Sequence, residues 1–309
     1  MLPIRSAEAL VRLAFKSSAS FSILNRAYNA LSWKQKQYFW RLLGGAFVNC
    51  AAATHDRQWK IMFGGREILL PLDTDRMWLD WLLAVSFLGH DAELKETYLA
   101  FLNSKRRPDV FVDVGANYGP NSLIFLVHGI RTISFEPNPA CHAYFRECGR
   151  LSGVEVDIRD AAVGDARDPV ELLFAERETW NGSAEPSVQR RLRETAGDRL
   201  QKVAVAQTTL DDILAADPAS RMLIKIDTEG FEERVLRGSR RIFETRRPTV
   251  IFEAWPEARV RMRLFGILAD FRYEVFPLPW TGGSGAPLSQ AAFEGAIGMN
   301  FIAFPAKDG

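Results

Sequence analysis

The chain contains few cysteines and histidines, no long hydrophobic run and almost no net charge. Among its 309 residues there are three cysteines and four histidines, and the formal net charge is +1. The cysteines (Cys50, Cys141 and Cys148) are odd in number and lack metal-ligand spacing, so we expect reduced thiols in a cytoplasmic protein. A charge near zero gives no support for a nucleic-acid partner. No stretch approaches the roughly 18 apolar residues of a membrane-spanning helix, and we expect no signal peptide.

The first 50 residues depart from this charge balance. Their one acidic residue is Glu8, and their seven basic residues are Arg5, Arg12, Lys16, Arg26, Lys34, Lys36 and Arg41. Apolar side chains at helical spacing predict two amphipathic helices over residues 7–31. We expect an N-terminal helical region at 1–104 that also holds a β-hairpin with a turn at Gly64-Gly65. We interpret segment 1–50 as a helical cap, with peripheral contact to an anionic membrane as the alternative.

The stretch beginning at Val110 gives the first indication of function. Its first five residues, Val110–Val114, are apolar and rich in β-branched types, which is typical of a buried strand. Gly115 ends this run, Gly119 follows, and helical spacing begins near Ser122. A strand, a glycine turn and a helix bring bare backbone N–H groups to the carboxyl edge of a parallel sheet. Nucleotide-like ligands bind at that edge in α/β proteins.

The glycine spacing narrows the choice of ligand. A dinucleotide fingerprint would need glycine at positions 115, 117 and 120, but Asn117 and Pro120 stand at the last two. The sequence also lacks a phosphate-binding loop that ends in Gly-Lys-Ser or Gly-Lys-Thr. Asn117 tolerates a left-handed backbone and can stand where glycine is usual. Asp113, at the strand end, is placed to accept hydrogen bonds from a polar or cationic ligand.

An acidic residue follows the second predicted strand, Arg131–Phe135. This residue, Glu136, comes about 20 positions after the glycine turn, where a carboxylate holds a ribose diol. Asn138 is expected to cap the next helix, with Pro139 at its first position. A ribose-binding acid without a phosphate-binding loop points to S-adenosyl-L-methionine as the cofactor.

Four motifs then occur in order along the chain. They are Asp113-Val-Gly-Ala-Asn-Tyr-Gly119, Phe135-Glu-Pro-Asn-Pro139, Thr209-Leu-Asp-Asp212 and Lys225-Ile-Asp-Thr-Glu-Gly230. Together they resemble the FkbM-type methyltransferases, which use S-adenosyl-L-methionine and mostly methylate hydroxyl groups. The resemblance covers residues 85–255 best. It implies an α/β, Rossmann-like class I methyltransferase domain at residues 105–309, with a doubly wound, mostly parallel sheet and an antiparallel edge pair.

The resemblance also implies which residues bind the cofactor. They lie in the glycine turn, after the second strand and after a third strand predicted at 154–158, and are Asp113, Gly115, Ala116, Asn117, Gly119, Glu136, Pro137, Asp160 and Ala161. In relatives the residue at the third strand end meets the adenine. A carboxylate such as Asp160 accepts a hydrogen bond from the adenine amine.

Candidate catalytic residues lie at the end of the fourth strand, predicted at Met222–Ile226. Asp227 stands at its tip, Glu229 follows in the turn, and Lys225 lies one residue inside the strand. We expect the Lys225 amine to pair with a carboxylate. A carboxylate at this edge can accept the proton of an alcohol. Asp227 and Glu229 can equally cap the next helix or hold a divalent ion, and spacing alone does not choose among these roles. We assign no metal ligand.

Strands predicted at 249–252, 273–276 and 300–304 complete the sheet. A long polar stretch at 177–201 interrupts the pattern of alternating strands and helices. We interpret it as a lid or acceptor-binding loop, with a mobile surface insertion as the alternative.

These observations favour an S-adenosyl-L-methionine-dependent O-methyltransferase. Its partner would be a small-molecule or glycan acceptor, namely a hydroxyl of a sugar, a glycolipid or a secondary metabolite. A NAD-binding oxidoreductase on the same kind of sheet is one alternative, although the third glycine is missing. A non-catalytic nucleotide-binding module is the other, since a fold does not by itself fix a function.

Overall fold

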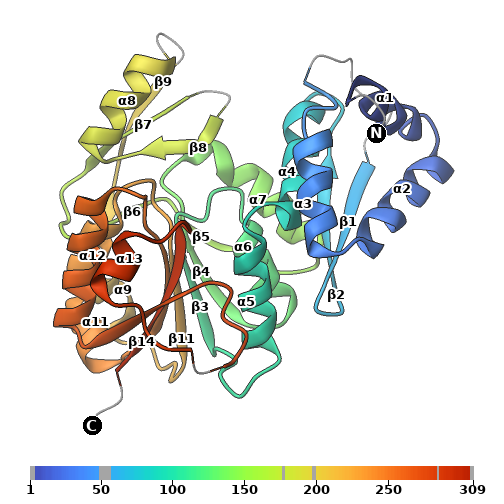
Figure 1. Cartoon of the computed structure of the whole chain (residues 1–309). Coiled ribbons are helices and arrows are strands. Elements are labelled where there is room, and N and C mark those ends of the chain that lie inside the picture. The colour runs from blue at the N-terminus through green and yellow to red at the C-terminus, as the bar shows by residue number, and fades with distance from the viewer. Residues whose placement is uncertain (1–3, 49–56, 176–177, 197–199, 284, 307–309) are drawn as a thin grey trace. The chain divides into compact units, whose positions relative to one another are not determined.

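The computed structural model describes residues 4–48, 57–175, 178–196, 200–283 and 285–306. The chain forms two compact units, which Figure 1 shows together with their secondary-structure elements. The first unit comprises Met1–Glu96 and Arg146–Val154, and the second comprises Thr97–Phe145 and Glu155–Gly309. The division of the chain between residues 104 and 105 stays a prediction.

The first unit combines helices with a two-stranded hairpin. Its elements are α1 (Ile4–Ala14), α2 (Ser18–Ala30), α3 (Trp33–Leu43), β1 (Arg57–Phe63), β2 (Arg66–Leu72) and α4 (Met77–Gly89). The hairpin turns at Gly64 and Gly65, whose φ angles of 54° and 80° favour glycine. Side chains alternate in burial along β1, and Trp59 packs on Trp81 with ring centroids 5.2 Å apart. The predicted helices and hairpin are confirmed.

The second unit contains a seven-stranded sheet in the order β13-β14-β12-β11-β3-β4-β5. Its strands are β3 (Val110–Val114), β4 (Arg131–Phe135), β5 (Asp157–Arg159), β11 (Met222–Ile226), β12 (Thr249–Glu253), β13 (Tyr273–Pro277) and β14 (Asn300–Pro305). All neighbours are parallel except the pairs that β14 makes with β12 and β13. The predicted doubly wound, mostly parallel sheet with an antiparallel edge pair is confirmed.

Helices lie on both sides of this sheet (Figure 1). They are α5 (Ala92–Leu102), α6 (Pro120–Val127), α7 (Pro139–Leu151), α9 (Leu210–Leu214), α10 (Glu232–Arg237), α11 (Arg240–Thr245), α12 (Ala258–Asp270) and α13 (Gln290–Glu294). Every residue of β3 and β11 is buried, as expected for strands covered on both faces. The cap of α7 is as predicted, because the Asn138 side chain accepts a hydrogen bond from the backbone N–H of Ala140.

The described part of the polar stretch at 177–201 forms a strand and a helix, so it is not a structureless loop, and its role as a lid or acceptor-binding segment stays a prediction. It contains β8 (Glu178–Ser183) and α8 (Pro186–Ala196) and runs into β9 (Leu200–Val205). Both strands pair antiparallel with β7 (Val170–Ala175) in a sheet of order β8-β7-β9. The sequence predicted strands at 170–174 and 203–207, which overlap β7 and β9, but its polar composition did not reveal β8.

The third strand of the main sheet is shorter than the prediction of 154–158. It covers Asp157–Arg159, because β5 is the edge strand and pairs only with residues Ile133–Phe135 of β4. A separate two-residue parallel pair follows, between β6 (Ala162–Val163) and β10 (Gln207–Thr208).

Two of the three cysteines lie among the described residues. Cys141 and Cys148 are buried and reduced, while Cys50 lies outside the described residues. Over the part of the chain that the structure describes, none of the helices has the length and hydrophobicity to span a bilayer.

A buried arginine holds together the segments that follow β12 and precede β14. Arg261 on α12 is fully buried. Its guanidinium donates hydrogen bonds to the backbone oxygens of Ala254 and Trp255 at 3.0 Å, and to those of Phe293 at 3.1 Å and Gly298 at 2.6 Å. The guanidinium thereby ties four backbone carbonyl groups from two segments to one buried charge, and hydrogen bonds to charged groups are stronger than those between neutral groups.

We therefore expect Arg261→Met to lower the free energy of unfolding by about 3 kcal/mol or more, because several buried carbonyl groups lose a charged donor. Urea denaturation followed by circular dichroism measures this change. The exposed Arg259 on the same helix provides the control, since Arg259→Met should leave the urea midpoint within experimental error. Equal midpoints for the two variants would contradict the role given to Arg261.

Candidate active site

The turn after β3 requires glycine at its first position. Gly115 has φ +81°, and a Cβ atom there would lie 1.7 Å from the backbone oxygen of Asp227, which follows β11. Asn117 adopts φ +52°, the left-handed conformation that the sequence predicted. At Gly119, with φ +83°, a Cβ atom would lie 2.2 Å from the ring of Phe145. The turn is therefore packed tightly against both neighbouring elements.

The backbone N–H groups of this turn are already bonded, which corrects the expectation of bare donors. Gly115 and Ala116 both donate to the backbone oxygen of Phe135, at 3.0 and 2.9 Å. The N–H of Asn117 donates to Glu136 Oε2 at 2.7 Å. The end of β4 uses these donors because it lies directly beside the turn.

Glu136 is a buried carboxylate with remaining hydrogen-bonding capacity. It is 8% exposed, and its second oxygen accepts a hydrogen bond from the N–H of Asn138 at 2.7 Å. Two carboxylate oxygens offer about four lone-pair positions, so two are left for hydroxyl groups such as those of a ribose. Burial raises the pKa of Glu136 to about 7, although the bonds from Asn138 and Asn117 oppose this shift.

Asp113 lies beneath the turn. Its side chain is fully buried, and Oδ2 accepts a hydrogen bond from the Ser122 hydroxyl at 2.7 Å. The Ser122 hydroxyl is also 2.9 Å from that of Ser134. Burial raises the pKa of Asp113. Contact of this carboxylate with the cofactor stays a prediction, because in the structure its hydrogen bond is with Ser122.

The remaining candidate cofactor residues lie near Glu136. The backbone N–H of Glu136 donates to the oxygen of Arg159 at 3.1 Å, which brings the end of β5 alongside. Asp160 is exposed, and Ala161 and Pro137 are partly buried. The geometry thus gathers the turn, the end of β4 and the end of β5 at one sheet edge. Direct contact of these residues with the cofactor stays a prediction.

A buried lysine connects this edge to the candidate catalytic residues. Lys225 is 2% exposed, and its Nζ donates to Asp227 Oδ2 at 2.9 Å while lying 3.9 Å from Asp113 Oδ1. In the sheet register Lys225 stands opposite Asp113, and Asp113 stands opposite Ser134. The predicted pairing of Lys225 with a carboxylate is confirmed.

Three carboxyl groups gather at the ends of β11 and β12. Ligand atoms of Asp227, Glu229 and Glu253 all lie within 4.8 Å of one another. Burial and repulsion from Asp227 raise the pKa of Glu229 to about 8 and that of Glu253 to about 10. Such a group of oxygens can hold a hard divalent cation, or it can retain protons on two of its members.

Neither Asp227 nor Glu229 caps α10, because its N-cap residue is Phe231, which makes no side-chain cap bond. The Glu232 side chain instead holds the turn that precedes this helix. Glu232 Oε1 accepts hydrogen bonds from the N–H and the hydroxyl of Thr228, at 2.8 and 2.9 Å, and from the N–H of Gly230 at 3.2 Å. Its position in the first turn of α10 was a readable indication.

Two further residues of the site were missed. Ser183 donates its hydroxyl hydrogen to the backbone oxygen of Glu229 at 2.7 Å, and Glu229 has a φ of +53°. Trp255 donates its indole N–H to Glu253 Oε2 at 2.9 Å. Ser183 could not be found from local pattern, because it belongs to the insertion and lies 46 residues from Glu229 in the chain. Trp255 lies only two residues after Glu253.

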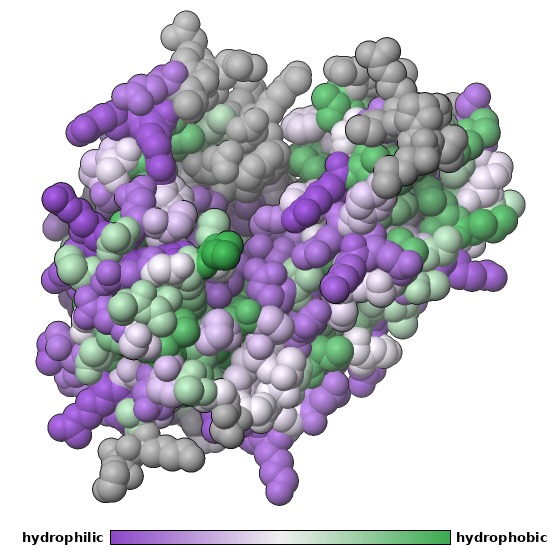
Figure 2. Space-filling view, viewed as in Figure 1, coloured by the Kyte–Doolittle hydropathy of each residue, from purple (hydrophilic) through white to green (hydrophobic). Residues whose placement is uncertain are grey.

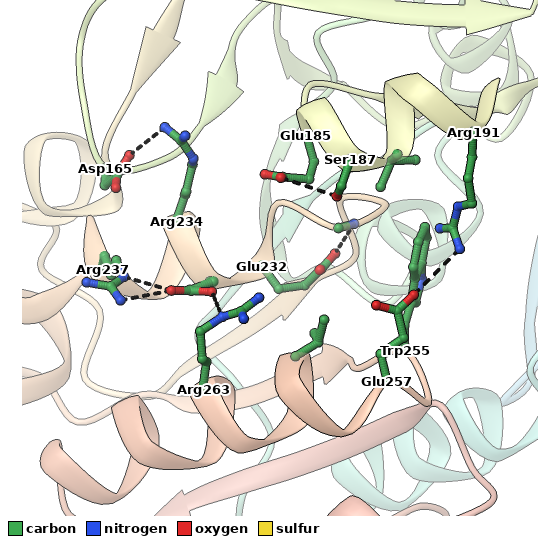
Figure 3. A pocket seen from close by; sticks show the side chains of 14 residues that line it. Asp165, Glu185, Ser187, Arg191, Glu232, Arg234, Arg237, Trp255, Glu257 and Arg263 are labelled. Carbon is green, nitrogen blue, oxygen red and sulfur yellow. Dashed lines mark hydrogen bonds and ion pairs between the residues drawn. The ribbon is translucent and has the colours of Figure 1, made fainter. Parts of the chain in front are cut away.

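A groove of about 600 Å³ opens beside the turn that follows β11, at residues 227–230 (Figure 3). Helices α8, α10 and α12 supply most of its lining, and Gly230 and Trp255 lie at its wall. The insertion packs closely there, since a Cβ atom on Gly230 would lie 2.9 Å from Val188 Cγ2.

The raised pKa of Glu136 predicts a pH-dependent stability. A pKa of about 7 in the folded chain, against an ordinary value of 4.5, means that the folded state holds the proton more tightly than the unfolded state. Protonation of Glu136 therefore adds roughly 3 kcal/mol to the free energy of unfolding below pH 4.5, and this contribution is lost as the pH rises to 7. We expect urea midpoints of Glu136→Gln to fall less than those of the unsubstituted chain across this interval. Parallel pH profiles would contradict the assignment.

The residues of this site also lie within a segment that matches a known protein family. Residues 113–273 match the methyltransferase FkbM domain family. No curated protein matches the chain. Among solved structures, methyltransferase FkbM from Methylobacillus flagellatus KT is 15% identical, with a TM-score of 0.38, over 75% of this chain and 55% of that one. The chain thus spans about half the length of that protein.

Two more distant structures were also found. Precorrin-6y C5,15-methyltransferase from Geobacter metallireducens GS-15 is 12% identical, with a TM-score of 0.36, over 69% of this chain and 89% of that one. The 16S rRNA N2 G1207 methyltransferase of T. Thermophilus, solved with AdoMet and guanosine, is 8% identical, with a TM-score of 0.38, over 82% and 51%. Similarity at this level says nothing about the substrate of this chain.

The family match carries the assignment. It spans more than half of the 309 residues and includes the sheet edge at which Glu136 and Asp227 lie. The chain therefore belongs to the FkbM family of methyltransferases, which use S-adenosyl-L-methionine as their cofactor.

Proposed function

We propose that this methyltransferase acts on a hydroxyl oxygen of a sugar, glycolipid or secondary metabolite, with Asp227 as the proton acceptor. The observation that carries the proposal is the placement of Asp227 at the end of β11, bonded to the buried Lys225. Membership of a methyltransferase family argues against the two alternatives, a NAD-binding oxidoreductase and a non-catalytic module. The two buried, reduced cysteines support a cytoplasmic location.

The cofactor fits the sheet edge as the chain builds it. When bound, S-adenosyl-L-methionine supplies a methyl group that its sulfonium already activates. The two lone-pair positions left on Glu136 would hold the ribose hydroxyls, and Asp160 with Ala161 would meet the adenine. Asp113 would act as a positioning residue, because its bond with Ser122 ties the start of α6 to β3.

A hydroxyl acceptor must lose a proton as its oxygen attacks the methyl group, and a positioned carboxylate can take that proton. Of the three clustered carboxyl groups, Glu229 and Glu253 have pKa values raised to about 8 and 10. We assign the proton acceptor role to Asp227 on its position, because it stands at the tip of β11 and its Oδ2 accepts a hydrogen bond from the buried Lys225.

Substitution of Asp227 tests this role. We expect Asp227→Asn to reduce methyl transfer by about 10²- to 10⁴-fold, the usual contribution of a general base, while binding of S-adenosyl-L-methionine is retained. Transfer of labelled methyl groups to a panel of sugars and other alcohols measures the first quantity, and calorimetry measures the second. The exposed Asp212, paired with Arg167, serves as a control through Asp212→Asn. Full activity of Asp227→Asn would exclude it as the base.

We also propose that the first unit contacts an anionic membrane surface. On α1, Leu10 and Leu13 are 54% and 55% exposed, and Ile23 on α2 is 69% exposed. Lys16 and Arg26 are exposed nearby in the sequence. Figure 2 shows hydrophobic side chains at the surface of this unit around α2. Exposed apolar residues among basic ones are typical of helices that lie on anionic bilayers.

Vesicle binding tests this contact. We expect co-sedimentation with phosphatidylglycerol vesicles that weakens with salt, and little with phosphatidylcholine. The double variant Leu10→Ser and Leu13→Ser should lower the binding constant by about tenfold or more, because two inserted side chains are lost. Ile297 in the second unit is 99% exposed, so Ile297→Ser is the matched control. Binding that is absent, or equal for the three proteins, would rule the contact out.

A further inference from the structure

The groove beside the turn at residues 227–230 is built mainly from three helices of the second unit. Figure 3 shows the side chains of α8, α10 and α12 converging on it, with Trp255 at its wall. Its volume of about 600 Å³ lies within the range of small-molecule sites. The lining is mostly charged, which disfavours an apolar ligand.

Every guanidinium of the groove is paired with a carboxylate. The nitrogen–oxygen distance is 3.6 Å or less in each of the pairs Arg234–Asp165, Arg191–Glu257, Arg237–Glu233 and Arg263–Glu233. Glu185 and Glu232 also line the groove, so five carboxyl groups face four guanidinium groups, which disfavours a phosphate or carboxylate ligand. A neutral polyol can donate to the carboxylates and accept from the guanidinium groups while the pairs persist.

An indole ring supplies the apolar part of the groove. Trp255 is partly exposed, its N–H is fixed by Glu253, and the Arg191 guanidinium lies 4.5 Å from its ring centroid. Aromatic faces flanked by polar groups suit ligands with one apolar and one polar side, such as a sugar ring with its C–H face and its hydroxyl edge.

The groove adjoins the reaction edge through its shared residues. Gly230 and Glu232 line it and belong to the turn that carries Asp227 and Glu229. Trp255 lines it as well and binds Glu253, the third member of the carboxyl cluster. Asp227, Glu229 and Glu253 do not themselves line the groove, so a ligand there would reach the proposed base past Gly230 and Trp255.

We infer that this groove binds a neutral sugar unit of the acceptor, held by the Arg191–Glu257 pair and by the Trp255 ring. The inference rests on the proposed function and narrows its acceptor to a carbohydrate. It disfavours an apolar secondary metabolite and an acidic sugar, because neither finds matching partners among the paired charges.

Binding of simple sugars to the full chain tests this inference without methyl transfer. The probes are methyl glycosides of glucose, galactose, mannose and fucose, measured by saturation-transfer difference NMR, with glucuronate and inorganic phosphate as anionic competitors. We expect at least one glycoside to bind about fivefold more tightly than glucuronate, and phosphate not to displace it. About fivefold corresponds to one hydrogen bond of ~1 kcal/mol.

Variants locate the binding. Arg191 and Glu257 are 54% and 59% exposed, so the double variant Arg191→Gln and Glu257→Gln should fold and weaken glycoside binding about fivefold or more. Trp255→Ala should weaken it as well. The matched control removes an exposed pair elsewhere, Arg240→Gln with Glu244→Gln, and should bind as the unsubstituted chain does.

Three results would overturn the inference: no glycoside bound, glucuronate or phosphate bound as tightly, or unchanged binding in the groove variants. Failure of the proposed function is distinguishable from these. Glycoside binding together with full activity of Asp227→Asn would refute the base and leave the groove assignment intact. Methylation of a non-sugar alcohol without any glycoside binding would refute the groove assignment alone.

Discussion

The buried ammonium group of Lys225 is the interaction on which the rest of the site depends. It lies between two carboxylates, 2.9 Å from Asp227 Oδ2 and 3.9 Å from Asp113 Oδ1, in a sheet that excludes water. A buried charge without partners would be strongly unfavourable. The chain can therefore bury Lys225 and Asp113 only with their charged partners in place. β3 and β11 are held in the register that sets Lys225 opposite Asp113.

That register places the proposed cofactor-binding turn and the proposed base at the same edge of the sheet. The glycine turn after β3 approaches the backbone oxygen of Asp227 so closely that only glycine fits at position 115. The proposed cofactor-binding residues and the proposed base are thus neighbours because of backbone packing. The insertion adds a third contribution, because Ser183 fixes the carbonyl group of Glu229. Through α8 the insertion also forms one wall of the groove in which we infer that the acceptor binds.

The sequence predicted the features that depend on local pattern. Apolar β-branched runs located β3 and β4, and Asn138 followed by Pro139 located the start of α7. The burial of the Asp113 side chain was not foreseen, because a strand buried at all five positions shows no alternation of polar and apolar residues. Ser183 was missed because its hydrogen bond joins distant segments. The bonds of Glu232 and Trp255 are local, to Thr228 and Glu253, but their residue types alone did not indicate these partners. The polar composition of β8 and α8 likewise concealed an ordered sheet and helix.

The central claim is that the edge formed by Glu136 and Asp227 receives the cofactor with its sulfur toward the base. A crystal structure with S-adenosylhomocysteine, the product of methyl transfer, tests it most directly. The account predicts ribose hydroxyls at hydrogen-bond distance from the Glu136 carboxylate, about 2.5–3.0 Å between oxygens, and the sulfur on the side of Asp227. A ribose bound by other residues, or a sulfur that faces away from Asp227, would contradict it.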